Sequence, residues 1–479
     1  MTQIDQPPSP GALAGWLVLG VRQLGLTAVT LVGVVVLGRL LGPSDFAVYG
    51  YVTVGVTLAL AVGDFGLSGR IIRDEVSPRD MQAIFGLQLA MVIGLGVLGA
   101  TLIGTGAVGG GHQLVVALIF VAMLLALLQT LPTAALERRQ DFRRVGVIEV
   151  GQRVVFTVGA IVLCLAGLKR VGIPLAAAGA GVASYIGAMI SSNWRGRPRF
   201  GSARGLLGGF AAHWWHGRLA TQLAYTAYPA LGGILLTARD VGHLTLSLTI
   251  VSFAGLLAPL VARATFPAMS ATADHDRRPE VFAEVFRAFA VASVPALAVV
   301  VVGARTIVEL GFGDGWLGAV PVIRMTCLPT LVGLGLTPSL PLLYLVLEPR
   351  RVKWMLVGWF VAQWALGAAG AELFGVLAIP VAGAVSALAV LVLLDRRLRA
   401  ATGGFSLIGE LAPPVTAGLL GTGVGVLVVS ALGEGLGAAA GCVACLVVYA
   451  VAIGSRRRLL DPRQLSRALS KGLRPLASS

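Results

Sequence analysis

The chain has 479 residues, of which 56% are hydrophobic and only 12% are charged, and its formal net charge is +15 at pH 7. A soluble globular protein carries about twice that charged fraction, so the composition excludes a soluble enzyme or a soluble binding domain. The basic residues are scattered over short segments between apolar runs, which argues against a nucleic-acid-binding surface.

Apolar segments follow one another along the whole chain, and each is long enough to cross a bilayer as a helix. A bilayer core of about 30 Å requires about 20 helical residues, and lipid admits only helices and closed barrels. The sequence therefore predicts an all-α polytopic membrane protein with about 14 transmembrane helices. In chain order the predicted spans are 13–38, 46–66, 82–105, 113–134, 145–167, 172–192, 209–236, 241–266, 283–310, 317–345, 352–371, 374–394, 409–431 and 437–454.

Basic residues collect in every second connection between these spans. Of the 37 Lys and Arg residues, 5 lie in the odd-numbered connections, and 28 lie in the even-numbered connections and the C-terminal tail. Because Lys and Arg collect on the cytoplasmic side of a membrane protein, both termini are predicted to be cytoplasmic. The segment 64–75, "DFGLSGRIIRDE", begins like the Mg²⁺-binding triplet of a protein kinase. The charge pattern makes it the cytoplasmic exit of the second span instead.

A weak internal repeat suggests how the spans are organised. Asp45-Phe46-Ala47 lies over Asp240-Val241-Gly242 at an offset of 195 residues, and both segments are short turns on the outer side. Six spans separate them, which predicts two six-helix lobes related by a pseudo-two-fold axis along the membrane normal, followed by two additional helices. The predicted organisation is a disordered cytoplasmic tail (1–12), an N-terminal lobe (13–192), a cytoplasmic linker (193–208), a C-terminal lobe (209–400), two additional transmembrane helices (401–454) and a basic cytoplasmic tail (455–479).

Four arginines remain inside the predicted spans or at their starts, and three of them are candidate substrate-binding residues. A charge deep in a span costs ~2.5–3.5 kcal/mol on insertion scales and tends to mark function. Arg22 lies about nine residues into the first span, with Gln23 beside it, and Arg218 lies in the equivalent helix of the second lobe. Arg153 lies in the fifth span, where Glu149 at i−4 offers an ion pair as the competing explanation. Because the arginine fork matches phosphate oxygens, these residues predict a cationic cavity for an anion that bears phosphate or carboxylate.

The residues that an enzyme or a cofactor would need are mostly absent, so no catalytic site, metal site or cofactor is predicted. None of the three lysines is followed by Ser or Thr, which excludes a P-loop for nucleotides. The outer connections are too short to carry a catalytic domain. Cys442-Val-Ala-Cys445 stands alone, without a second cysteine pair or a nearby histidine. This favours a role in helix packing over metal or redox chemistry.

Three parts of the sequence resemble a known family in their order and spacing. "GRLLGPSDFAVYGYVTV" (38–54) followed by "DFGLSGRIIRDE" (64–75), "RATFPAMSATAD" (263–274) and "GDGWLGAVPVIRM" (313–325) resemble segments of the polysaccharide/oligosaccharide flippases. These form the polysaccharide-transporter branch of the multidrug/oligosaccharidyl-lipid/polysaccharide exporter superfamily. The resemblance covers about residues 13–400. One departure is Ala47, where the family usually has glycine.

The resemblance implies a flippase that moves polyprenyl-diphosphate-linked oligosaccharides to the outer leaflet of the bacterial plasma (inner) membrane. A cationic lumen is common in the family and agrees with Arg22 and Arg218. The implied partners are the lipid-linked oligosaccharide, membrane lipids, and glycan polymerases or glycosyltransferases. A cation-coupled drug exporter of the same superfamily is the alternative, and it requires an acidic ion site for which Glu149 and Glu372 are the candidates. A membrane enzyme of glycan assembly and a non-transporting scaffold also stay open.

Overall fold

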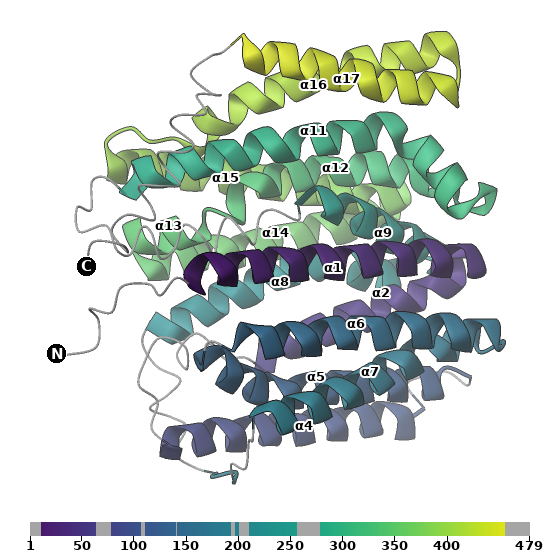
Figure 1. Cartoon of the computed structure of the whole chain (residues 1–479), viewed down its shortest axis with the longest axis vertical. Helices are drawn as coiled ribbons and strands as arrows, with labels where there is room; N and C mark the ends of the chain where they lie inside the picture. Colours follow the sequence, from purple (N-terminus) through teal and green to yellow (C-terminus); the bar gives the residue numbers. More distant parts are fainter. Residues whose placement is uncertain are drawn as a thin grey trace. The chain divides into compact units, whose positions relative to one another are not determined.

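The chain folds into helices that form two compact units. The computed structural model describes residues 11–63, 78–106, 111–139, 141–192, 197–200, 210–255 and 278–455. Within these ranges every regular element is a helix. One unit comprises Ala12–Thr245 and the other Leu246–Ser479 with Met1–Gly11. We name them the N-terminal unit and the C-terminal unit, and Figure 1 colours their helices along the sequence.

The described helices of the N-terminal unit are α1 (Gly11–Leu40), α2 (Pro43–Gly63), α4 (Pro78–Gly104), α5 (Gln113–Arg138), α6 (Phe142–Leu165), α7 (Lys169–Ser192), α8 (Phe210–Leu235) and the first half of α9 (Ala238–Ser252). The C-terminal unit continues from α9 with η2 (Phe253–Gly255), α11 (Arg278–Phe312), η4 (Asp314–Trp316), α12 (Ala319–Leu336), α13 (Leu340–Val346), α14 (Pro349–Phe374), η5 (Gly375–Leu377), α15 (Ala378–Thr402), α16 (Leu407–Leu432) and α17 (Leu436–Gly454).

Each of the predicted spans overlaps a helix, which confirms the all-α prediction. Ten segments of the described chain are long and apolar enough to cross a membrane, and one of them, Pro349–Thr402, contains both α14 and α15. The chain is therefore a multi-pass membrane protein. The count of about 14 crossings and the cytoplasmic location of both termini stay predictions.

One predicted span, 317–345, is not a single helix. α12 ends at Leu336 and α13 begins at Leu340. Pro338 and Pro341 explain the interruption, because proline lacks the N–H that would bond to the carbonyl one helical turn earlier. Ser339 compensates for part of the loss, since its hydroxyl donates to the carbonyl of Gly335 at 2.6 Å. This bond matters because a backbone carbonyl left without a donor is costly in lipid.

Small residues allow the helices of the N-terminal unit to approach one another. α7 packs against both α5 and α6, and α2 packs against α5 and α8. A Cβ atom placed on Gly181 of α7 would lie 2.9 Å from the Cβ of Leu125 on α5. Any side chain at 181 would therefore push α7 away from α5. Close approach at small residues is the usual way in which membrane helices associate.

The two additional helices predicted for 401–454 correspond to α16 and α17, which pack closely against each other (Figure 1). A Cβ atom on Gly441 would lie 2.6 Å from the carbonyl oxygen of Gly425, so the two backbones meet there. The pair also packs on α11, where the hydroxyl of Tyr449 donates to the carbonyl of Val291 at 2.8 Å. These two helices are thus an integral part of the C-terminal unit.

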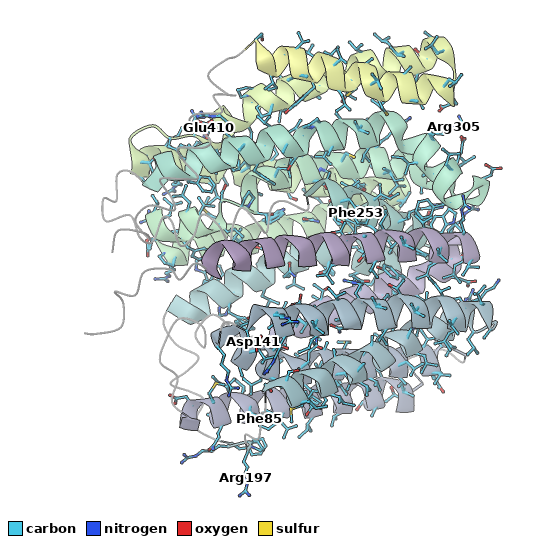
Figure 2. The ribbon with its side chains drawn as sticks, viewed as in Figure 1. Phe85, Asp141, Arg197, Phe253, Arg305 and Glu410 are labelled. Carbon is cyan, nitrogen blue, oxygen red and sulfur yellow. The ribbon has the colours of Figure 1, made fainter. Side chains whose placement is uncertain are left out.

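Ion pairs join this helix pair to α11 at both of its ends. Arg287 binds Glu410, which is labelled in Figure 2, through two hydrogen bonds of 2.7 and 2.9 Å. Both side chains are largely buried. The guanidinium of Arg305 lies 3.8 Å from the carboxylate of Glu434, in the turn between α16 and α17. Eighteen residues of helix separate the two arginines, which is about 27 Å. The bidentate pair is the stronger of the two, because the other is exposed to solvent.

The division into units differs from the predicted lobe boundary at 193–208. It falls within α9, after Thr245. Of the predicted linker only residues 197–200 are described, and there the Arg199 N–H donates to the carbonyl of Gln82 at 2.9 Å. The predicted lobes stay predictions. Several predicted features lie outside the described residues, namely most of the tails 1–12 and 455–479 and the motifs 64–75 and 263–274.

Candidate functional site

Two short turns join pairs of helices at equivalent positions of the predicted repeat. α1 ends at Leu40 and α2 begins at Pro43, while α8 ends at Leu235 and α9 begins at Ala238. Both boundaries recur after 195 residues, which is the offset seen in the sequence. We refer to α1–α2 and α8–α9 as the two hairpins.

The acidic residues in these turns have structural partners. Asp45 forms an ion pair of 2.6 Å with Arg170 at the start of α7. Asp240 accepts a hydrogen bond of 2.6 Å from the hydroxyl of Thr237, whose own oxygen accepts from the Asp240 N–H at 3.3 Å. The second arrangement is a helix N-cap. Both carboxylates therefore stabilise turns.

The two hairpins touch each other through glycine. A Cβ atom on Gly242 of α9 would clash with the carbonyl group of Pro43, the first residue of α2. A Cβ atom on Gly50 of α2 would clash in the same way with the side chain of Thr245 on α9. We name these four residues the hairpin contact. It holds α9 against α2 with no room for a larger side chain at either glycine.

Helix α2 also contacts α8 at two widely separated points. A Cβ atom on Gly233 of α8 would lie 2.8 Å from the ring of Tyr51. Near the other end of α8, the indole N–H of Trp215 donates to the carbonyl of Ala61 at 3.0 Å. Since Ala61 follows Tyr51 while Trp215 precedes Gly233, the two helices are antiparallel. α2 is thus held by α8 along much of its length.

Arg153 is the one predicted site residue whose side chain is described. It is half-buried on α6 and lies near enough to Tyr49 of α2 for an electrostatic interaction. The ring of Tyr49 stacks on Phe46 with centroids 5.1 Å apart. Within the described part of the chain, Arg153 forms neither a hydrogen bond nor an ion pair, so the ion pair with Glu149 that was the alternative does not form. A half-buried cation that has no ion pair among the described residues favours an anion from outside the protein.

The directions of the helices determine where Arg22 lies relative to Arg153. α2 and α5 run in the same direction, because Gly55 faces Met123 and Gly63 faces Leu127. α1 is antiparallel to α2, and α6 is antiparallel to α5, since only a short turn joins each pair. It follows that α1 and α6 run in the same direction.

A contact between α1 and α6 then sets their relative height. A Cβ atom on Gly33 would lie 2.7 Å from the side chain of Thr157. Measured from that contact at 1.5 Å per residue, Arg153 lies about 6 Å and Arg22 about 16 Å toward the helix starts. The Cα atoms of the two arginines are therefore about 10 Å apart in height on neighbouring helices.

The remaining predicted site residues are placed only through their helices. Arg22 and Gln23 belong to α1, and Arg218 belongs to α8, but their side chains lie outside what the structure describes. Whether the four residues form one site stays a prediction.

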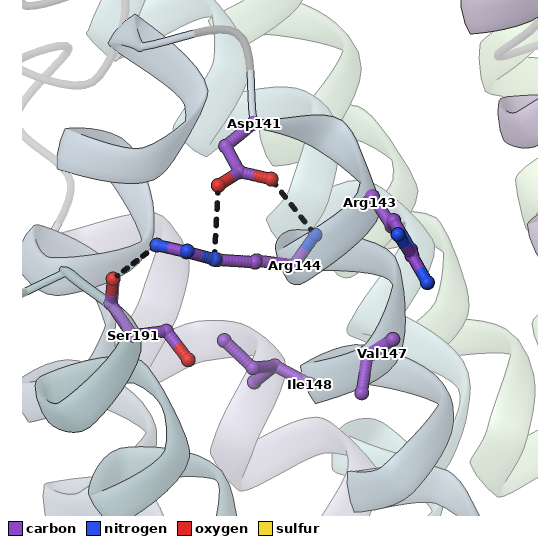
Figure 3. A pocket seen from close by; sticks show the side chains of 6 residues that line it. All are labelled: Asp141, Arg143, Arg144, Val147, Ile148 and Ser191. Atoms are coloured by element: carbon purple, nitrogen blue, oxygen red, sulfur yellow. Dashed lines mark hydrogen bonds and ion pairs between the residues drawn. The ribbon is translucent and has the colours of Figure 1, made fainter.

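A separate pocket of about 350 Å³ opens where α6 begins and α7 ends (Figure 3). Asp141 caps α6 by accepting from the Arg144 N–H at 3.2 Å, and its other oxygen lies 3.1 Å from the Arg144 guanidinium. The same guanidinium donates to the carbonyl of Ser191 on α7 at 3.1 Å. Arg143 is exposed and has no such partner among the described residues. The pocket is lined by Asp141, Arg143, Arg144, Val147, Ile148 and Ser191.

A family model described as "Polysaccharide biosynthesis protein" matches residues 36–321, which is more than half of the chain. The chain belongs to this family. This confirms the resemblance found in the sequence, because the match includes the motifs at 38–54, 64–75 and 263–274 and most of the motif at 313–325. It also includes the hairpin contact and Arg153. Comparison with curated protein sequences finds no match.

The fold of this chain resembles that of solved membrane transporters. A lipid II flippase MurJ in an inward closed conformation superposes with a TM-score of 0.71 at 9% identity, covering 92% of this chain and 99% of that one. An inward-facing multidrug resistance MATE family transporter of the MOP superfamily gives 0.59 at 15% identity, with coverage of 79% and 96%. MATE in complex with MaL6 gives 0.55 at 14% identity, with coverage of 81% and 97%.

The described residues hold no cluster of three or more His, Cys, Asp or Glu side chains that could bind a metal ion. Cys445 packs with Ala298 and Val302 of α11, and Cys442 also contacts this cluster, so both cysteines lie where helices pack. Sequence reasoning missed the hairpin contact, although Gly50 and Gly242 lie in or beside the segments that revealed the repeat. It also missed the pocket, whose only signal was an aspartate followed by two arginines at the start of a helix.

Proposed function

We propose that this polysaccharide biosynthesis protein is a flippase for lipid-linked oligosaccharides. Its cargo is a glycan on a polyprenyl diphosphate, which it carries from the cytoplasmic to the outer leaflet of a bacterial inner membrane. The protein works by alternating access and makes or breaks no covalent bond. Family membership and the transporter fold support this proposal.

The observation that carries the proposal is Arg153, a half-buried cation with no counter-charge in the described chain. Charged groups at such depth are retained where they bind a substrate or an ion. Arginine suits phosphate oxygens because its planar fork donates two parallel hydrogen bonds. An anionic cargo supplies the missing charge.

The spacing of the cations fits an extended anionic head better than a single ion. Arg22 and Arg153 differ by about 10 Å in height, which a diphosphate with its first sugar covers when both side chains reach toward it. The diphosphate and the sugars would travel along this polar path while the lipid tail stays in the membrane. Transport at a site that opens to one side at a time is the mode of two-lobed transporters.

A cation-coupled exporter of the same superfamily is the second candidate, since MATE transporters share the fold. Such an exporter needs an acidic side chain available to bind its coupling ion. Of the two predicted candidates, Glu372 is exposed near the end of α14, and Glu149 of α6 is engaged in an interaction within the protein. Asp45 and Asp240 are engaged in turns.

Depletion of the protein in its host, followed by profiling of lipid-linked oligosaccharides in each leaflet, distinguishes the two functions. A flippase leaves a complete polyprenyl-diphosphate oligosaccharide facing the cytoplasm. Complementation with Arg153→Ala should restore little export, Arg153→Lys should restore part of it, and Arg350→Ala should restore it fully. If depletion left the lipid-linked intermediates unchanged and made the host sensitive to cationic dyes, the result would contradict the flippase and favour the exporter.

A further inference from the structure

The pocket between α6 and α7 is not needed for the proposed transport, yet it presents an available cation. Arg144 is engaged by Asp141 and by the carbonyl of Ser191. Arg139 likewise donates to the carbonyl of Ser192 at 3.2 Å, and so caps the C-terminus of α7. Arg143 is the lining arginine without a partner in the described chain. Residues 137–144 hold four arginines, one glutamate and one aspartate, which gives this end of the helices a formal charge of +2.

One side of the pocket is apolar and continues onto the exposed surface of α6. Val147 lines the pocket and is 68% exposed. Val154 and Val158, seven and eleven residues further along α6, are also exposed. These spacings put the three valines on one face of the helix, and Arg143, four residues before Val147, lies at the end of that face. A lipid-facing apolar stripe therefore begins at a cation.

The length of this stripe matches one leaflet of a membrane. From Val147 to Val158 the helix rises about 16 Å, which is about half of the ~30 Å hydrocarbon core. Helix α7 packs beside α6 and adds Ile186 and Ile190, both exposed. An amphiphile could therefore place its anionic head at Arg143 and its apolar chains along the exposed stripe.

We propose that this pocket binds the phosphate headgroup of an anionic phospholipid, whose acyl chains lie along the exposed stripe of α6. The guanidinium of Arg143 binds the phosphate, and Arg144, held by Asp141 and Ser191, adds positive charge beside it. The predicted cytoplasmic location of this end places the lipid in the leaflet that carries anionic lipids. The site goes beyond the proposed function and does not depend on the identity of the cargo.

Native mass spectrometry of the full-length chain in a neutral detergent tests this site. The protein is titrated with phosphatidylglycerol and with phosphatidylcholine of the same acyl chains. In Arg143→Ala the affinity for phosphatidylglycerol should fall about tenfold, as expected when a hydrogen-bonded charge pair is lost. Arg143→Lys should lose less, because it keeps the charge but not the fork. The matched control is Arg350→Ala on α14, where an exposed arginine also lacks an ion pair within the described chain.

Three results would overturn the proposal. Equal losses in Arg143→Ala and Arg350→Ala would mean that only diffuse surface charge attracts the lipid. Equal affinity of the wild-type protein for the two lipids would mean that the apolar stripe acts alone. Displacement of phosphatidylglycerol by inorganic phosphate at similar concentrations would mean a site for a free anion. Val147→Ser separates the last two cases, because it should weaken the lipid and leave free phosphate unaffected. All three substituted residues, Arg143, Val147 and Arg350, are exposed, and thermal unfolding checks that each variant is folded.

Discussion

Replacement of Gly242 by alanine should force the two hairpins apart. The added Cβ atom would lie 2.6 Å from the carbonyl carbon of Pro43 and 3.0 Å from its Cα, and closer still to its oxygen. Carbon atoms in contact prefer about 3.5–4.0 Å, so α9 must move by about 1 Å relative to the α1–α2 turn. The obstacle is backbone, which cannot rotate away as a side chain could.

The energetic size of this change follows from the cost of overpacking. Inserting a methyl group into a close contact costs about 1–3 kcal/mol. A penalty of ~2 kcal/mol on the state that contains the hairpin contact would lower the population of that state, relative to states without the contact, about 30-fold. A protein that is 100:1 in favour of the contact would become about 3:1. This shift is large enough to measure as a change in population, and we expect the flipping rate to fall with it.

Distance measurement between spin labels provides the assay. Ser44 and Arg239 are exposed in the first turns of α2 and α9, and labels there report the separation of the hairpins. The background protein lacks its four native cysteines. Gly179→Ala is the control, since a Cβ atom there meets nothing within 4 Å. If Gly242→Ala and Gly179→Ala gave the same distance distribution and the same flipping rate, the hairpin contact would not stabilise a state of the transport cycle.

Two further predictions concern other contacts. Gly50→Ala should open the hairpins like Gly242→Ala, but addition of Thr245→Ala should restore them, because the obstacle there is a side chain; failure of the double variant to recover in the same label assay would contradict the geometry. Glu410→Gln should lower the free energy of unfolding of the purified protein by about 1–2 kcal/mol, since it weakens a largely buried bidentate pair. The loss should shrink when Arg287→Met is already present, and additive losses in that double-mutant cycle would show that the pair contributes nothing.

The sequence was most informative where a single physical requirement dominates. Apolar length predicted the helices because lipid leaves the backbone no other way to satisfy its hydrogen bonds. The offset of 195 residues predicted the matching turns at Leu40–Pro43 and Leu235–Ala238. The break after Leu336 did not follow from the sequence, since Pro338 and Pro341 do not reveal whether a helix bends or ends.

Contacts between distant segments could not be predicted in the same way. With 64 glycines in the chain, nothing in the sequence distinguishes Gly242, which meets a backbone carbonyl, from Gly179, which meets nothing. The spacing of Glu149 and Arg153 allows an ion pair on any helix. In the folded chain that pair is absent and Arg153 lies near Tyr49 instead. Side-chain direction depends on the neighbouring helix, which local spacing does not encode.

Helix α2 brings the candidate cargo site and the hairpin contact into one rigid element. Tyr49, beside Arg153, directly precedes Gly50, which packs against Thr245. A bound anion that draws Arg153 away from Tyr49 acts one residue from the contact that holds α9. Binding can shift the protein between conformations only if the cargo interacts differently with them, and this adjacency is where we expect such a difference to arise. Arg153 is half-buried, has no ion pair among the described residues and lies next to a contact without spare room. It is therefore suited to couple the presence of cargo to the separation of the hairpins.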